Sequence, residues 1–214
     1  GVGGMEFDFT TLPERDRYRL LSSFVAPRPI ALVTTLSAEG IANAAPMSFF
    51  NVFSQEPPIV ILGIQCRPDG GIKDTVTNIT RRQSFCVNMV DIALAEAMIT
   101  CGISYAPDVD EIATAGLTMT PASQIDGGWI AESPCAMECV VEETIRYARR
   151  EIILGRVVQM HVRDNCLDDA GRYVRPENYQ PIARLHADNY ITSDRQFELK
   201  VPETPPVGVT QKAN

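Results

Sequence analysis

Residues 70–75 (GGIKDT) place two glycines directly before a cation and a hydroxyl, at the expected start of a helix. Backbone N–H groups and the positive end of a helix attract anions, so Lys73 and Thr75 in the first turn could help to hold one phosphate. Arg67 could reach the same point. The alternative is an ordinary helix start, in which Asp74 and Thr75 satisfy the first N–H groups. The pattern leaves both interpretations open.

Residues 43–51 (NAAPMSFFN) form a second stretch that could bind a ligand. Small side chains let a flat molecule approach the backbone, and Ser48 and Asn51 could hydrogen-bond its polar edge. However, two adjacent phenylalanines are more often one core residue and one interface residue than a ligand cradle. The stretch is therefore a weak indication when taken alone.

Side chains for hydrolytic or metal chemistry are scarce. No GxSxG motif surrounds Ser48, and a catalytic triad or zinc site would have to use His161 or His186, the only two histidines. We expect His161 to be a solvated strand residue and His186 to lie in a polar loop, although His186 is the better candidate of the two for a catalytic role. Cys135 and Cys139 lack CxxC spacing and are expected to be small hydrophobic residues on one strand face. We expect no metal site and assign no catalytic residue.

Charge and composition exclude several classes of protein. The chain has 214 residues, 19 Lys and Arg against 27 Asp and Glu, and a formal net charge of −8, which argues against broad binding to nucleic acid or to an anionic membrane. It has no Walker motif, and no apolar run approaches the roughly 20 residues of a membrane-spanning helix. Residues 1–4 before Met5 read as an artificial remnant, and with no secretory signal we expect a cytoplasmic protein.

Hydrophobic periodicity predicts several strands and a few helices to position these residues. Strands are expected at residues 30–36, 41–47, 59–64, 84–89, 136–145 and 152–162, and helices at residues 12–25, 72–82 and 91–100, the last capped by Asp91. The apolar faces of the two longest strands are expected to be Met137, Cys139 and Val141, and Ile152, Leu154, Val158, Met160 and Val162. Because the order lacks regular β-α alternation, it predicts a mostly antiparallel barrel.

Several separated motifs, taken in order, resemble the flavin reductase-like family of FMN-binding split barrels, and within it the flavoredoxin and nitrilotriacetate monooxygenase component B branch. The motifs are APRPIALVTT at residues 26–35, residues 43–51 ahead of EPP at 56–58, KDT at 73–75 with NI at 78–79, DE at 110–111 with AGLT at 115–118, ESP at 132–134 with EC at 138–139, and YQPIARL at 179–185. We expect one barrel domain over residues 7–200, an extension at 1–6 and a proline-rich tail at 201–214.

The resemblance implies a mostly β fold, a Greek-key antiparallel split β-barrel with a few peripheral helices. It also implies a homodimer with one non-covalent FMN at each end of the subunit interface. The residues that it assigns to the flavin ring are Pro46, Met47, Ser48, Phe49, Phe50 and Asn51. Those that it assigns to the phosphate and ribityl end are Lys73, Asp74, Thr75 and Asn78, assisted by Arg67 and Arg28.

The implied activity is an FMN-dependent oxidoreductase. NADH or NADPH would deliver hydride to the flavin, and electrons would pass to free flavin, a partner monooxygenase or another acceptor. The alternatives are a flavin-binding or electron-relay module without turnover and a barrel that has lost its flavin. Related sequences generally carry Gly-Gly where this chain has His186 and Ala187. We expect this departure to affect access of substrate and nicotinamide more than binding of FMN.

Overall fold

The computed structural model of the chain describes residues 3–65, 74–103, 106 and 108–214. Its helices are α1 (Glu14–Phe24), α2 (Asp74–Arg82), α3 (Ala95–Cys101) and α4 (Glu111–Thr114), with short 3-10 turns η1 (Ile92–Leu94) and η2 (Asp164–Cys166). Its strands are β1 (Arg28–Pro29), β2 (Ala31–Leu36), β3 (Ala42–Met47), β4 (Phe50–Gln55), β5 (Pro58–Gln65), β6 (Ser84–Met89), β7 (Met119–Pro121), β8 (Gly128–Ile130), β9 (Cys135–Arg146), β10 (Arg150–Val162), β11 (Ile182–Arg184) and β12 (Tyr190–Thr192).

Seven strands form one antiparallel sheet in the order β3-β2-β6-β9-β10-β5-β4. Consecutive strands β3 and β4 therefore lie at opposite edges of the sheet, although only Ser48 and Phe49 separate them. Three Cα–Cα steps of about 3.8 Å allow at most about 11 Å between the ends of the two strands. The sheet must roll until its edges face each other. The Phe49 carbonyl accepts the Gly63 N–H (2.8 Å), which continues the pairing of β4 with β5 into the link.

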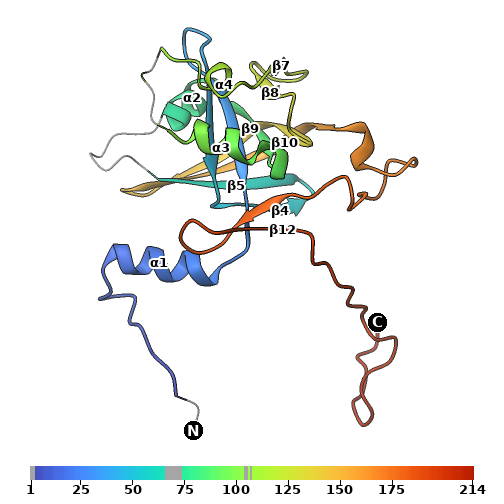
Figure 1. Cartoon of the computed structure of the whole chain (residues 1–214). Helices are drawn as coiled ribbons and strands as arrows, with labels where there is room; N and C mark the ends of the chain where they lie inside the picture. Colours follow the sequence, from blue (N-terminus) through green and yellow to red (C-terminus); the bar gives the residue numbers. More distant parts are fainter. Residues whose placement is uncertain (1–2, 66–73, 104–105, 107) are drawn as a thin grey trace.

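Smaller elements surround the rolled sheet. Strands β1, β11 and β12 form a second sheet, and β7 and β8 form a hairpin. In Figure 1, α2, α3, α4 and the β7–β8 hairpin lie on one side of the seven-stranded sheet, and α1 lies on the other. Among the described residues, no helix is long and apolar enough to cross a membrane.

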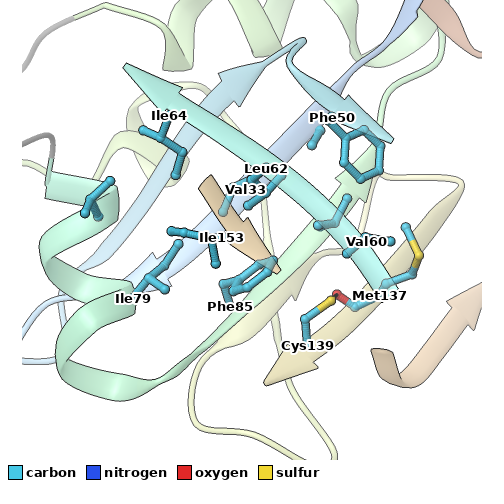
Figure 2. Close-up of a cluster of buried hydrophobic side chains, with 13 residues drawn as sticks. Val33, Phe50, Val60, Leu62, Ile64, Ile79, Phe85, Met137, Cys139 and Ile153 are labelled. Atoms are coloured by element: carbon cyan, nitrogen blue, oxygen red, sulfur yellow. Dashed lines mark hydrogen bonds between the residues drawn. The ribbon is translucent and has the colours of Figure 1, made fainter. Parts of the chain in front are cut away.

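The main core fills the inside of the rolled sheet. Figure 2 shows buried side chains converging there from β2, β4, β5, β6, β9, β10 and α2. Strand β2 also serves a second core: Ala31 and Val33 point into the main core, while Leu32 packs with residues of α3, α4 and β8. This double burial explains why the β2 sequence is apolar on both faces.

The predicted strands are confirmed, as are the helix at residues 12–25 and the described part of the helix at residues 72–82, of which 72–73 lie outside the described residues. The helix expected at residues 91–100 is instead the 3-10 turn η1, capped by Asp91, followed by α3.

The apolar face expected for β10 is wrong. In β10 the buried residues are Glu151, Ile153 and Gly155, on the face opposite to Ile152 and Leu154. Bulges interrupt its pairing with β9 between residues 154 and 155 and between 157 and 159. Strand β9 keeps its expected core face, with Met137 and Cys139 buried.

Gly155 is needed because the Phe85 ring packs against the backbone at this bulge. A Cβ at position 155 would lie 2.5 Å from Cζ of Phe85 and 3.3 Å from Cβ of Cys139. No side chain fits there unless the aromatic ring moves.

Three buried polar side chains fix the β7–β8 hairpin to the large sheet. The Thr34 hydroxyl donates to the Gly128 carbonyl (2.8 Å), and the Asn88 side-chain oxygen accepts the Ile130 N–H (2.8 Å). The fully buried Glu138 carboxylate accepts N–H groups from residues 123 and 124 of the hairpin loop (2.8 and 2.7 Å). Because these buried polar groups are hydrogen-bonded, they avoid the free-energy penalty of losing water without gaining another partner.

His161 is a correction to the expectation of a solvated strand residue. Its Nε2 lies 2.6 Å from Oε2 of Glu138, and its ring stacks on Trp129 with centroids 4.4 Å apart. Burial tends to raise the pKa of Glu138, but hydrogen bonds from the Ser123 N–H, His161 and the Gln124 N–H bring it below its usual value. Strand alternation could not reveal that the hairpin loop covers this face of β9.

Replacing Glu138→Gln should lower the free energy of unfolding near pH 7 by about 1–3 kcal/mol, because buried donors lose a charged acceptor. A lowered folded pKa gives stability that is present above the unfolded pKa and is lost as pH falls through the folded value. The difference in the free energy of unfolding between the variant and the unmodified protein should therefore be smaller in urea titrations at a pH below the folded pKa of Glu138 than at pH 7. Glu198→Gln, on the exposed tail, is the control, and an equal difference at both pH values would contradict the assignment.

Candidate functional site

A pocket of about 410 Å³ lies where the two edges of the sheet face each other. Its walls come from the end of β3, the two linking residues, the end of β5, α3 and β12. The lining residues are Tyr18, Ile30, Ala45, Pro46, Met47, Ser48, Phe49, Gly63, Ile64, Gln65, Met98, Ile99, Gly102, Ile103, Arg150, Arg184 and Tyr190. The volume is within the range of small-molecule and cofactor sites.

Glycines allow the walls of the pocket to approach one another. A Cβ at Gly63 would lie 3.3 Å from Cβ of Phe49, and one at Gly102 would lie 3.2 Å from the Ile99 carbonyl oxygen and 3.5 Å from Cγ of Pro46. Backbone is thus part of the pocket surface, as a flat ligand requires.

Phe49 is held between a second aromatic ring and two cations. Its ring stacks on Tyr18 with centroids 6.1 Å apart, and the guanidinium carbons of Arg150 and Arg28 lie 4.5 and 5.6 Å from its centroid. Cation–π contacts of this kind orient a ring as well as stabilise it. Arg150 also donates to the Gly63 carbonyl (3.1 Å), which ties β10 to the pocket end of β5.

Arg28 connects α1 to the pocket. Its guanidinium donates to the carbonyls of Ser22 and Val25 at the end of α1, and its Nε donates to the Ser48 hydroxyl (3.4 Å). Burial lowers the pKa of Arg28 from its ordinary value. Among the described residues, no carboxylate lies within 4 Å of this guanidinium. Its charge instead interacts with the partial negative charge of the carbonyls at the end of α1, and its Nε holds Ser48 in place.

Arg184, at the end of β11, also lines the pocket. Its Nε donates to the Ala187 carbonyl (3.0 Å) and another guanidinium nitrogen donates to the Tyr190 hydroxyl (3.1 Å). The nearest carboxylate, Asp188, is exposed and 3.8 Å away. Ala187 has φ +51°, a left-handed conformation that favours glycine, and His186 is exposed and outside the pocket lining.

The residues predicted to line a flavin ring divide into three groups. Pro46, Met47, Ser48 and Phe49 line the pocket. Phe50 belongs to the main core, which agrees with the alternative interpretation that one of the two adjacent phenylalanines is a core residue. Asn51 is exposed on β4, where its side-chain oxygen accepts the N–H of Val52 (2.7 Å).

Of the residues predicted for the phosphate end, Arg28 lies on β1, where it bonds the end of α1 and Ser48, and the others lie at α2 or before it in the sequence. Arg67 and Lys73 are outside the described residues, and Asp74 is the first residue of α2. Thr75 and Asn78 are buried where α2 packs on β2 and β3, and the Asn78 amide donates to the Thr35 hydroxyl (3.1 Å). Their contact with a ligand stays a prediction, whereas their role in fixing α2 follows from these bonds.

Glu111 is a polar residue of this region that residue chemistry alone did not single out. In the side-chain orientation that its hydrogen bonds favour, the Asn43 amide oxygen accepts from the Thr75 hydroxyl (2.9 Å) and the amide nitrogen donates to the Glu111 carboxylate (3.0 Å). The same carboxylate accepts the Ala44 N–H (3.2 Å). Burial raises the pKa of Glu111 to about 7, and Asp74 and Asp110 add to the shift. The network joins α4, β3 and the first turn of α2.

Stability should depend on this carboxyl group. A carboxyl whose folded pKa is raised ionises first in the unfolded chain, so stability falls as pH rises from the unfolded pKa near 4.5 to the folded value of about 7. Allowing for solvent screening, we expect a loss of about 1–2 kcal/mol over this range, absent in Glu111→Gln. Urea unfolding at a series of pH values measures it, with Glu198→Gln as control, and an unchanged slope in Glu111→Gln would contradict it.

The sequence matches the model of the flavin reductase like domain over residues 23–183, which is most of the chain. The chain belongs to the flavin reductase-like family. Its mostly β architecture, with an antiparallel seven-stranded sheet that does not close, is therefore the expected split barrel. A Shewanella frigidimarina protein with a split barrel domain has the same fold, with a TM-score of 0.77 at 22% identity over 93% of this chain and 100% of that one.

Two solved structures of more similar sequence are a nitroreductase and a component of a monooxygenase. The 2-nitrobenzoate 2-nitroreductase of Pseudomonas fluorescens is 35% identical, with a TM-score of 0.86 over 95% of this chain and 100% of that one. Nitrilotriacetate monooxygenase component B of Bacillus cereus is 31% identical, with a TM-score of 0.87 over 93% of this chain and 100% of that one. Together with the family match they indicate a flavin-related oxidoreductase.

Proposed function

We propose that this flavin reductase-like protein binds FMN non-covalently and uses NADH or NADPH to reduce it. The observation that carries the proposal is the pocket at the split of the sheet. Four consecutive residues that the family resemblance assigns to the flavin ring, at positions 46–49, line it.

The residues around the pocket fit such a group. A volume of about 410 Å³, glycine-backed walls and the Phe49 ring suit a flat aromatic molecule. The end of β5 at Gln65 leads toward the segment with Arg67 and Lys73 and then to the start of α2, where we place the phosphate. When bound, FMN supplies the capacity to accept a hydride and release electrons, and the protein supplies orientation and electrostatic surroundings.

The described lining of the pocket contains two arginines but no carboxylate and no histidine. Hydride transfer requires no protein acid or base, so this lining suits the proposed reaction. We further propose that electrons pass to free flavin or a partner monooxygenase, and that the protein acts as a homodimer in the cytoplasm.

Substituting Lys73→Ala together with Thr75→Ala should weaken FMN binding by about 10-fold or more, because charge-assisted hydrogen bonds to a phosphate contribute about 1.5–3 kcal/mol each. The absorbance spectrum of the purified protein gives its flavin occupancy, and quenching of flavin fluorescence gives the Kd. Lys200→Ala, which removes an exposed cation near the C-terminus, is the control. Unchanged occupancy in the double variant would refute the phosphate assignment.

Turnover separates a reductase from a non-catalytic flavin module. Steady-state oxidation of NADH and of NADPH with added FMN should be rapid if the protein is a reductase. Bound flavin without nicotinamide oxidation would favour the carrier or relay, and a colourless protein that takes up no FMN would mean that the barrel binds another ligand.

A second candidate function is direct reduction of a nitro group on an aromatic acid. The specific observation is that the pocket lining contains two arginines, Arg150 and Arg184, together with the aromatic rings of Phe49 and Tyr190. An aromatic carboxylate can stack on the rings while a guanidinium binds its charge. The 35% identical Pseudomonas protein is a reductase of 2-nitrobenzoate, a molecule of this class.

This candidate predicts that Arg184→Ala raises KM for 2-nitrobenzoate by about 10-fold or more, through loss of a charge-assisted hydrogen bond. KM for nitrobenzene, which lacks the carboxylate, should not change. Arg149→Ala is a matched control, because Arg149 pairs with Glu14 (3.2 Å) and lies outside the pocket lining. A parallel rise in KM for both substrates would exclude a carboxylate contact with Arg184.

A further inference from the structure

We propose that residues 195–201 of one copy of the chain, the C-terminal arm, add as an extra strand to the free edge of β4 in a second copy. The occupant of the β4 edge is thus an identified segment of the same protein. The proposal concerns how two copies meet and does not require bound flavin.

The C-terminal arm (RQFELKV) has the pattern of a strand without a sheet. Phe197, Leu199 and Val201 alternate along it and are 82, 85 and 91% exposed. Glu198 and Lys200 lie on the other side, where their charged groups are 3.4 Å apart. An extended segment with one apolar face and one charged face gains stability only when the apolar face is covered.

The edge of β4 matches the arm in length and character. Strand β4 (Phe50–Gln55) is the last strand of the seven and pairs only with β5, while β1 lies close to it without pairing. Val52 and Phe53, beside its bulge, are 65 and 66% exposed. An exposed strand edge with apolar side chains is a template for an added strand, which uses main-chain hydrogen bonds and alternate side chains.

The direction of the arm indicates a second copy as its partner. In Figure 1 the chain after β12 runs away from the body, and its tail ends far from the sheet. The high exposure of its apolar side chains shows that its own sheet does not cover them. Because β4 begins directly after Phe49, an arm from the second copy would lie beside the strand that leaves the pocket.

A cross-link between differently substituted chains tests this arrangement. One chain carries Val52→Cys and the other carries Leu199→Cys, and the two are mixed and oxidised with glutathione disulfide. We expect a disulfide between positions 52 and 199 of different chains, identified by mass spectrometry of the linked peptides. Lys212→Cys in place of Leu199→Cys is the control for chance collisions of the tail. Absence of the 52–199 link above this control overturns the proposal, as does a link formed only when both cysteines are on one chain.

The apolar face of the arm should also contribute to dimer affinity. Phe197→Ser with Leu199→Ser should raise the dimer Kd in sedimentation experiments by about 10-fold or more, because two buried apolar side chains are lost. Glu198→Ser with Lys200→Ser, on the charged face, should leave it within about 2-fold. Equal effects of the two pairs, or a full-length chain that sediments as a monomer, overturn the proposal. FMN occupancy is measured separately, so failure of the flavin assignment does not affect this result.

Discussion

The architecture depends on a constraint of chain length: two residues connect strands that lie at opposite edges of a seven-stranded sheet. A sheet with ordinary right-handed twist can satisfy this only by rolling up, and the short link keeps the edges close without making them neighbours in the hydrogen-bonded order. The roll encloses the main core, and the opening left between the edges becomes the pocket. Core and site therefore have the same origin.

Buried polar bonds attach the remaining elements to the rolled sheet. The Asn78 amide joins α2 to β2, Asn43 links α2 to α4 through Glu111, and Asn88 and Glu138 hold the β7–β8 hairpin. Apolar packing alone would allow these elements to slide over the sheet, whereas a buried donor must meet its acceptor at one position. The polar network thus specifies where the elements sit, and the apolar clusters supply most of the stabilising energy.

Much of the fold could be predicted from periodicity, because strands that face a core on one or both sides have recognisable patterns. The core face of β9 at Met137 and Cys139 is an example. The pattern failed at β10, where two bulges shift the register and Gly155 replaces an apolar side chain on the inner face. It also missed β4, since most of its residues are exposed and show no alternation.

The candidate site was predictable only in part, because its residues come together through topology. Motif order identified residues 46–49, but Arg150 and Arg184 reach the pocket from β10 and β11, distant in sequence. Arg184 stands in the YQPIARL motif at residues 179–185, but neither that motif nor periodicity places it or Arg150 at the pocket. The role of His161 was hidden for the same reason, since its partner Glu138 is buried by a loop that pairing rules do not place.

The contact of Phe85 with the glycine backbone at position 155 also restricts how this family of sequences can diverge. A ring carbon that would lie 2.5 Å from a Cβ leaves no freedom at either position separately. A larger residue at 155 becomes acceptable only after the aromatic ring at 85 has been lost, and that first step leaves a cavity in the barrel core. The two positions are therefore expected to covary among relatives, with glycine found opposite the aromatic ring.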